Sequence, residues 1–175
     1  DWLCQHAAAI RNRQMKIAGE AIHHSCVAHL RHITEGGDPF EMLEARPLDF
    51  GHWSAHKLEP LTGYRLRHGE AVGMGVAIDS LYSSIEHGLP KEKAIAVCEC
   101  LATLGLPLWD AALEPIDRLL VGLEEFRQHL GGRLTVTMLQ DVGQPIDVHQ
   151  INAASMKLAI GQLRQLSMNA VKTGH

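Results

Sequence analysis

Long apolar runs and an excess of basic residues are both missing from this sequence. No apolar stretch approaches the about 18 to 20 residues that a membrane-spanning helix needs, and the first residues are neither basic nor signal-like. With 16 Lys and Arg against 20 Asp and Glu, the formal net charge is -4, which favours neither nucleic acid nor an anionic membrane as a partner. We therefore expect a cytoplasmic protein whose partners are recognised at specific sites.

Cysteine is scarce and shows no pattern of disulfide pairing. The four residues are Cys4, Cys26, Cys98 and Cys100, and they form neither a CxxC pair nor a framework spacing. This usage fits a reducing compartment, so we expect the set to be buried thiols. Cys98 and Cys100 stand two residues apart on an expected helix, and we expect one to face the core and the other the surface.

The length of 175 residues and the 46% apolar content suit a single domain with its own core. The chain begins without Met and enters a helical pattern at once, which suggests a piece of a longer protein. We therefore expect residues 1–175 to be one helical domain of a larger parent.

Apolar residues recur mainly at the three- and four-residue spacing of amphipathic helices. We expect one long helix from about Leu3 to Ile33, bent at Gly19, and then a loop over residues 40–50. Further helices are expected from about His52, over 68–86, 91–104 and 115–130, and over 148–165. The alternating residues Leu134–Leu139 predict one strand. The fold class is therefore mainly α, with one short strand or hairpin.

Histidine is abundant, with twelve residues, and three of them fall in one short window. His52 and His56 are four residues apart, so a helix would place both rings on one face. The turn at Gly63 would bring His68 back toward them. Neutral imidazoles are good Zn²⁺ ligands, and a catalytic site needs only three protein ligands. By spacing alone, surface or capping histidines explain the pattern equally well.

The residues around these histidines carry a more specific signal. The strings LDFGHWSAHKLE, from Leu48 to Glu59, and LRHGEAV, from Leu66 to Val72, together resemble the signature of the 3-dehydroquinate synthase family, LNFGHxxGHxxE followed by HGEAV. The resemblance implies that His52 and His68 bind a divalent metal, Zn or Co. It also implies that His56 is a catalytic residue that helps to move protons.

The same resemblance implies that the chain is the C-terminal, metal-binding helical domain of a sugar phosphate cyclase. Such an enzyme uses bound NAD to oxidise an alcohol transiently, eliminates phosphate, reduces the ketone again and closes a carbocycle by an aldol step. The family's third metal ligand, a Glu, and its amino-terminal NAD-binding domain would both lie outside this chain. We therefore expect the isolated chain to be inactive, and a homodimer because the family forms one. Glu59 or Glu70 would orient a histidine.

Departures from the family signature bear on the substrate. Asp49 stands where the family has Asn, which replaces an amide with a carboxylate. Arg46 matches an expected Arg with a one-residue offset, and Arg127 alone supplies charge where the family has a DKK phosphate-binding triplet. With Arg67 near a helix start, these residues are the substrate-binding candidates. They favour a 3-dehydroquinate synthase-like subgroup acting on another heptulose-type sugar phosphate.

Two other functions fit parts of the pattern. An iron-type NAD-dependent alcohol or polyol dehydrogenase also joins an NAD domain to a helical metal domain, although the GHxxxHKxE and HGEAV strings argue against it. A non-catalytic remnant would explain the missing Glu and the missing cofactor domain. A second histidine cluster, His23, His24, His29 and His32, lies around several faces of the first expected helix. We do not expect it to bind metal.

Overall fold

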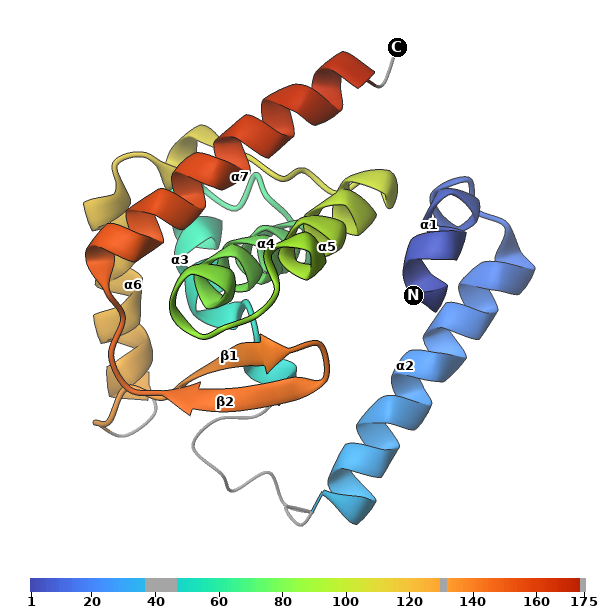
Figure 1. Ribbon diagram of the computed structural model, residues 1–175, viewed down its shortest axis with the longest axis horizontal. Coiled ribbons are helices and arrows are strands. Elements are labelled where there is room, and N and C mark those ends of the chain that lie inside the picture. The colour runs from blue at the N-terminus through green and yellow to red at the C-terminus, as the bar shows by residue number, and fades with distance from the viewer. Residues whose placement is uncertain (37–46, 130–131, 174–175) are drawn as a thin grey trace.

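The computed structural model describes residues 1–36, 47–129 and 132–173, and these residues form a helical domain with one small sheet (Figure 1). The α-helices are α1 (Trp2–Arg11), α2 (Met15–Glu35), α3 (His52–Leu61), α4 (His68–Glu86), α5 (Lys91–Thr103), α6 (Ile116–His129) and α7 (Ala153–Thr173). Short 3-10 helices occur at η1 (Pro47–Asp49) and η2 (Ala111–Leu113), and the strands are β1 (Val136–Asp141) and β2 (Gln144–Val148). The mainly α fold class predicted from the sequence is confirmed.

Helix α4 is the centre of the core. Its small and apolar sequence lets α3, α5, α7 and β1 pack around it, as the ribbon shows (Figure 1). Met74 and Ile78 are fully buried and Leu81 is almost so. No helix in the described ranges has both the length and the apolarity to cross a membrane.

Glycine permits a very close approach between α3 and α4. Gly51, just before α3, has a positive φ of 82°, a conformation that other residues adopt only with strain. A Cβ added to Gly75 on α4 would lie 1.9 Å from the carbonyl oxygen of Gly51. The small residues of α4 are therefore needed for packing, and this contact fixes the position from which α3 begins.

The single long helix predicted at the start of the chain is wrong. The chain breaks between α1 and α2 at residues 12–14, where Arg13 takes a positive φ of 57°, while Gly19 lies inside α2. The turn lets α2 fold back, so that Trp2 on α1 stacks on His6 and meets the edge of His24 on α2. No residue of α2 is fully buried, and the two helices stand at one side of the molecule (Figure 1).

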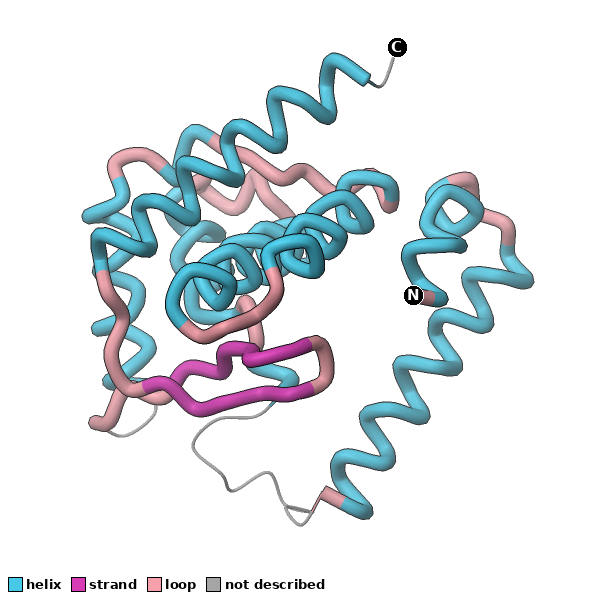
Figure 2. Tube along the Cα trace, in the orientation of Figure 1, coloured by secondary structure: helices cyan, strands magenta, loops and turns pink. Residues whose placement is uncertain are grey.

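The predicted strand is one arm of a hairpin (Figure 2). β1 pairs antiparallel with β2, with Val136 opposite Val148 and Met138 opposite Ile146. Because Val148 belongs to β2, the expected start of the last helix near that residue is wrong. Helix α7 begins at Ala153, after Asn152, whose side chain accepts hydrogen bonds from the first backbone N–H groups, and it continues beyond residue 165.

The cysteines differ from expectation in two ways. The sequence analysis expected buried thiols, which is wrong for Cys4 and Cys26, because both are exposed. It also expected one of Cys98 and Cys100 at the surface, but both are buried. The physical reason is that α5 packs against α1 as well as against α4.

Candidate metal and catalytic site

Three histidines from α3 and the start of α4 face one another. The ring centres of His52 and His56 are 5.9 Å apart, those of His52 and His68 5.5 Å, and those of His56 and His68 6.0 Å. The one-turn spacing on α3 places His52 and His56 together, and the return of the chain through Gly63 brings His68 to them, as the sequence predicted. The structure thus places the predicted metal ligands and the predicted catalytic histidine in one cluster.

A tight turn returns the chain from α3 to α4. Gly63 and Tyr64 both have positive φ, 59° and 60°, and the Thr62 hydroxyl donates to the carbonyl of Leu58 at 2.9 Å. This turn ends α3 within a few residues and lets α4 begin at His68. His68 therefore lies beside His52, although the two are sixteen residues apart in sequence.

Asp79, a residue that the sequence analysis did not single out, anchors the beginning of α3. It is fully buried on α4 and accepts hydrogen bonds from the Gly51 backbone N–H at 3.0 Å and the Trp53 indole N–H at 2.9 Å. Burial raises the pKa of this carboxyl to about 7, although both hydrogen bonds act to lower it. The signal that could have identified Asp79 from the sequence is a charged residue among the small and apolar residues of α4.

Glu59 supplies the carboxylate nearest to the histidines. Its Oε2 lies 3.3 Å from Nδ1 of His68 and 3.8 Å from Nδ1 of His56. A carboxylate on one ring nitrogen fixes the tautomer and leaves the other nitrogen available as a ligand. The other proposed carboxylate, Glu70, instead accepts hydrogen bonds from the backbone and guanidinium of Arg67. Glu59 is therefore the orienting candidate that the geometry favours.

The histidine cluster fits part of a metal site. Nδ1 of His52 is buried without a hydrogen-bond partner among the described residues, and leaving a buried polar nitrogen unsatisfied costs about 1 to 3 kcal/mol. Two imidazoles on one tetrahedral Zn²⁺, with bonds of about 2.0 Å, would have ring centres about 5 Å apart, close to the 5.5 Å between His52 and His68. Within the described ranges no three His, Cys, Asp or Glu residues are already set to hold a metal ion. The described residues can supply two ligands, and a metal ion here would need a further one.

The predicted substrate-binding residues are less closely gathered. Asp49 lies in η1, three residues before His52. Arg67 precedes α4 and is largely exposed, paired with Glu70 at 2.6 Å. Arg127 on α6 binds Glu124 and the Gly132 carbonyl. Arg46 lies outside the described residues.

These ion pairs reduce the charge available to a substrate. The guanidinium of Arg127 lowers the pKa of Glu124 to about 2, so that carboxylate stays ionised and holds the arginine. A phosphate group would have to compete with Glu124 for Arg127, and with Glu70 for Arg67. Their roles in binding substrate stay predictions.

A small cavity of about 230 Å³ adjoins His56. It lies between α3 and α6 and is lined by Trp53, His56, Lys57, Gly122, Glu125 and Phe126. Lys57 is paired with Glu125 at 2.5 Å across it, and a Cβ on Gly122 would come within 2.7 Å of the Lys57 Cβ. The cavity therefore combines an aromatic wall with an ion pair whose charge is already balanced.

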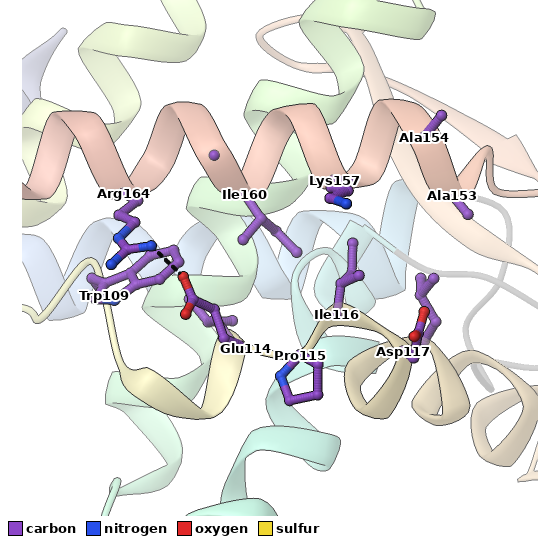
Figure 3. A pocket seen from close by; sticks show the side chains of 13 residues that line it. Trp109, Glu114, Pro115, Ile116, Asp117, Ala153, Ala154, Lys157, Ile160 and Arg164 are labelled. Carbon is purple, nitrogen blue, oxygen red and sulfur yellow. Dashed lines mark hydrogen bonds and ion pairs between the residues drawn. The ribbon is translucent and has the colours of Figure 1, made fainter.

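A larger cavity of about 760 Å³ lies elsewhere, between α6 and α7 (Figure 3). Arg164 pairs with Glu114 at 2.5 Å on one side of it and lies over the Trp109 ring. None of the three clustered histidines lines this cavity. It is not part of the candidate site.

The fold and the cluster define a helical domain that presents imidazole donors at the junction of two helices. Residues 1–125 match the family model of the 3-dehydroquinate synthase C-terminal domain. The chain belongs to this family, and the resemblance seen in the sequence is confirmed.

Several curated relatives are similar to this chain over less than half their own length. A 3-dehydroquinate synthase from Aeropyrum pernix is 37% identical over 62% of this chain and 30% of its own. One from Rhodopseudomonas palustris is 30% identical over 86% and 41%. A 2-epi-valiolone synthase from Actinosynnema mirum is 29% identical over 74% and 35%.

A solved structure shares the fold. It is a 2-epi-5-epi-valiolone synthase from Streptomyces hygroscopicus with NAD⁺ and Zn²⁺ bound, 22% identical, with a TM-score of 0.84 over 94% of this chain and 46% of that one. The chain thus spans about half the length of that protein or less.

Proposed function

We propose that this chain is the metal-binding helical half of a sugar phosphate cyclase, a lyase that eliminates phosphate from a heptulose-type sugar phosphate. The observation that carries the proposal is the convergence of His52, His56 and His68 within the family's two signature strings. The family match favours this reaction class over the iron-type dehydrogenase.

His52 and His68 would hold a divalent metal, Zn or Co, together with a ligand from outside this chain. The metal would supply Lewis acidity first to the hydroxyl group of the alcohol that is oxidised, and later to the carbonyl group that reacts in the aldol step. The buried Nδ1 of His52 without a partner supports this assignment. Glu59, through Nδ1 of His68, would hold that ring in position.

His56 would move protons at the substrate. Its side chain is 60% exposed, lines the small cavity and lies one helical turn from the proposed ligand His52, so it can reach a bound sugar without being a ligand. Asp49, Arg46, Arg67 and Arg127 are the residues proposed to bind the substrate.

In this proposal the sugar phosphate differs from the substrate of 3-dehydroquinate synthase itself. Two departures from the family signature support this difference. Asp49 stands where the family has Asn, and Phe126-Arg127-Gln128 stand where it has the DKK triplet. The similarity to a 2-epi-valiolone synthase supports it as well. NAD would be bound by a separate amino-terminal half, since the described strands form a hairpin and make no strand, glycine loop and helix unit that could hold a dinucleotide. A homodimer and a cytoplasmic location stay predictions.

The test joins this chain to the amino-terminal half of the Streptomyces hygroscopicus synthase, whose solved structure has NAD⁺ and Zn²⁺ bound, and measures phosphate release from heptulose phosphates with both present. We expect release by the joined protein, none by the chain alone, and a loss of about 10²- to 10⁴-fold in His56→Ala. A joined protein that binds NAD⁺ and Zn²⁺ yet releases no phosphate from any of these sugars would contradict the proposal.

A further inference from the structure

The small cavity beside His56 contains an ion pair that the proposed reaction does not use. Lys57 on α3 follows His56 directly, and its Nζ lies 2.5 Å from Oε1 of Glu125 on α6. The Lys57 side chain is only 15% exposed, whereas that of Glu125 is 55% exposed. Lysine is rarely buried to this extent unless it is paired. The pair therefore places a hydrogen-bond donor and an acceptor side by side at the wall of the cavity.

Gly122 makes room for this lysine. A Cβ added to Gly122 would lie 2.7 Å from Cβ of Lys57 and 3.0 Å from its Cγ, so even alanine would push the lysine stem aside. Gly122 lies inside α6, where alanine is normally the better helix former. The glycine is therefore explained by the space that it leaves for the Lys57 side chain.

Aromatic rings form the other walls of the cavity. Trp53 and Phe126 line it, and the indole N–H of Trp53 is already bonded to a buried carboxylate, so Trp53 offers only ring atoms to a ligand. Phe126 belongs to the segment that replaces the family's charged DKK triplet. Polar recognition in this cavity therefore depends on Lys57, Glu125 and His56.

Charge and size together indicate which part of a substrate the cavity takes. A phosphate group would be repelled by the Glu125 carboxylate, while an uncharged hydroxyl group would not. An ammonium has three donors and a carboxylate about four acceptor sites, and the ion pair uses one of each. The volume of about 230 Å³ is below the about 300 to 1,000 Å³ of sites that enclose a whole small molecule. The cavity therefore suits one hydroxylated part of a sugar.

We propose that Lys57 and Glu125 bind two neighbouring hydroxyl groups of the sugar, with Lys57 donating a hydrogen bond to one and Glu125 accepting a hydrogen bond from the other. This inference rests on the proposed function and adds the residues that determine which sugar is accepted. Because His56 lines the same cavity, these hydroxyl groups are the ones beside the carbon at which His56 moves a proton. The phosphate group is held elsewhere.

The experiment titrates the isotope-labelled 175-residue protein with sedoheptulose, a heptulose without phosphate, and follows its N–H signals by nuclear magnetic resonance. We expect saturable shifts at Gly122, at His56 and at the Trp53 indole. Inorganic phosphate at the same concentration should leave these signals in place. Lys57→Met and Glu125→Gln should each weaken sugar binding by about 10-fold or more, the usual effect of losing a hydrogen bond to a charged group.

Two further variants separate sugar recognition from the structural effect of an ion pair. Gly122→Ala keeps both charged groups but displaces the Lys57 stem, so it should also weaken sugar binding. Lys93→Met removes the lysine of a different ion pair, which joins Lys93 to Asp141 at 2.6 Å, and it should leave sugar binding unchanged. Well-dispersed spectra without sugar establish that each variant is folded.

Three results would overturn the proposal: larger shifts of the cavity signals with phosphate than with the sugar, no saturable shift with the sugar, or equally tight binding by Lys57→Met and the wild type. The titration needs neither NAD⁺ nor a metal, so its outcome is separate from that of the phosphate-release test. Sugar binding through Lys57 and Glu125 by a chain whose joined form releases no phosphate would contradict only the proposed reaction. Phosphate release that Lys57→Met leaves unchanged would contradict only this inference.

Discussion

Asp79 shows how one buried residue determines the geometry of the site. Its two oxygens hold Gly51 and Trp53, the residues on either side of His52, so the carboxylate sets the direction from which α3 starts. The cost is that burial raises its pKa from 3.8 to about 7. The folded state therefore binds a proton there more tightly than the unfolded state does.

Replacing Asp79 should alter how stability depends on pH. Because the folded pKa is raised, the contribution of Asp79 to the free energy of unfolding is complete below about pH 4 and is lost as pH rises to about 7. Asp79→Asn removes this titration, so the difference between variant and wild type should change by a few kcal/mol between pH 4 and pH 7. Urea unfolding across this range measures it.

The control for that experiment is Asp147→Asn, which changes an exposed carboxylate on β2. Its pH profile should follow that of the wild type. A profile for Asp79→Asn that also runs parallel to the wild type would mean that Asp79 does not titrate differently in the folded protein.

Glu59 offers a second test at the residue scale. Its Oε2 lies 3.3 Å from Nδ1 of His68, and removing such an orienting carboxylate usually weakens metal binding by about 10- to 100-fold. We expect Glu59→Gln to weaken Zn²⁺ binding in calorimetric titration by this amount. Glu70→Gln is the matched control, since Glu70 bonds Arg67 and not a histidine, and equal losses in both variants would count against the role of Glu59.

Among the elements, the close crossing of α3 and α4 is the feature that brings the histidines together. Capping and glycine signals predicted helices over 68–86, 91–104 and 115–130. These bounds agree with those of α4, α5 and α6 within a residue or two. The turn at Arg13 was not predicted, and the second strand was expected only as part of a possible hairpin, without its residues. Neither has a strong local signal, because a non-glycine residue in the left-handed region and a strand containing Pro145 both depend on tertiary contacts.

Enlarging Gly75 should separate the two helices. A Cβ there would lie 1.9 Å from the Gly51 carbonyl oxygen and 2.7 Å from the Ser54 hydroxyl, and backbone cannot move aside cheaply. We expect Gly75→Ala to lower the free energy of unfolding by about 1 to 3 kcal/mol or more. Denaturant unfolding measures this change.

Gly161→Ala in α7 is the matched control, because no atom lies within 4 Å of its added Cβ. Alanine there should be neutral or stabilise the helix by up to about 1 kcal/mol. Similar destabilisation by both substitutions would show that helix propensity, and not the α3–α4 contact, explains the effect.

At the scale of the whole molecule, apolar periodicity predicted the fold class, and two linked strings of sequence predicted the family and the histidine cluster. They did so because residues within one helix and one turn determine the cluster. The contacts of Asp79 to Gly51 and Trp53 span 28 and 26 residues, and α1 packs against α5, which is far along the chain, so spacing rules could not find them. The chain covers 30% to 41% of the three curated relatives described above, which is why complete chemistry is expected only with a second half.

The most direct measurement is Zn²⁺ binding by this chain joined to an amino-terminal half that supplies the further ligand, by elemental analysis and calorimetric titration, in the wild type and in a His52→Ala, His68→Ala double variant. A His23→Ala, His29→Ala double variant on α2 controls for the loss of two histidines. The account predicts one Zn²⁺ per chain in the wild type and the control, and none in the first variant. Equal binding by all three proteins, or loss in the α2 variant alone, would contradict the assignment of His52 and His68 as metal ligands.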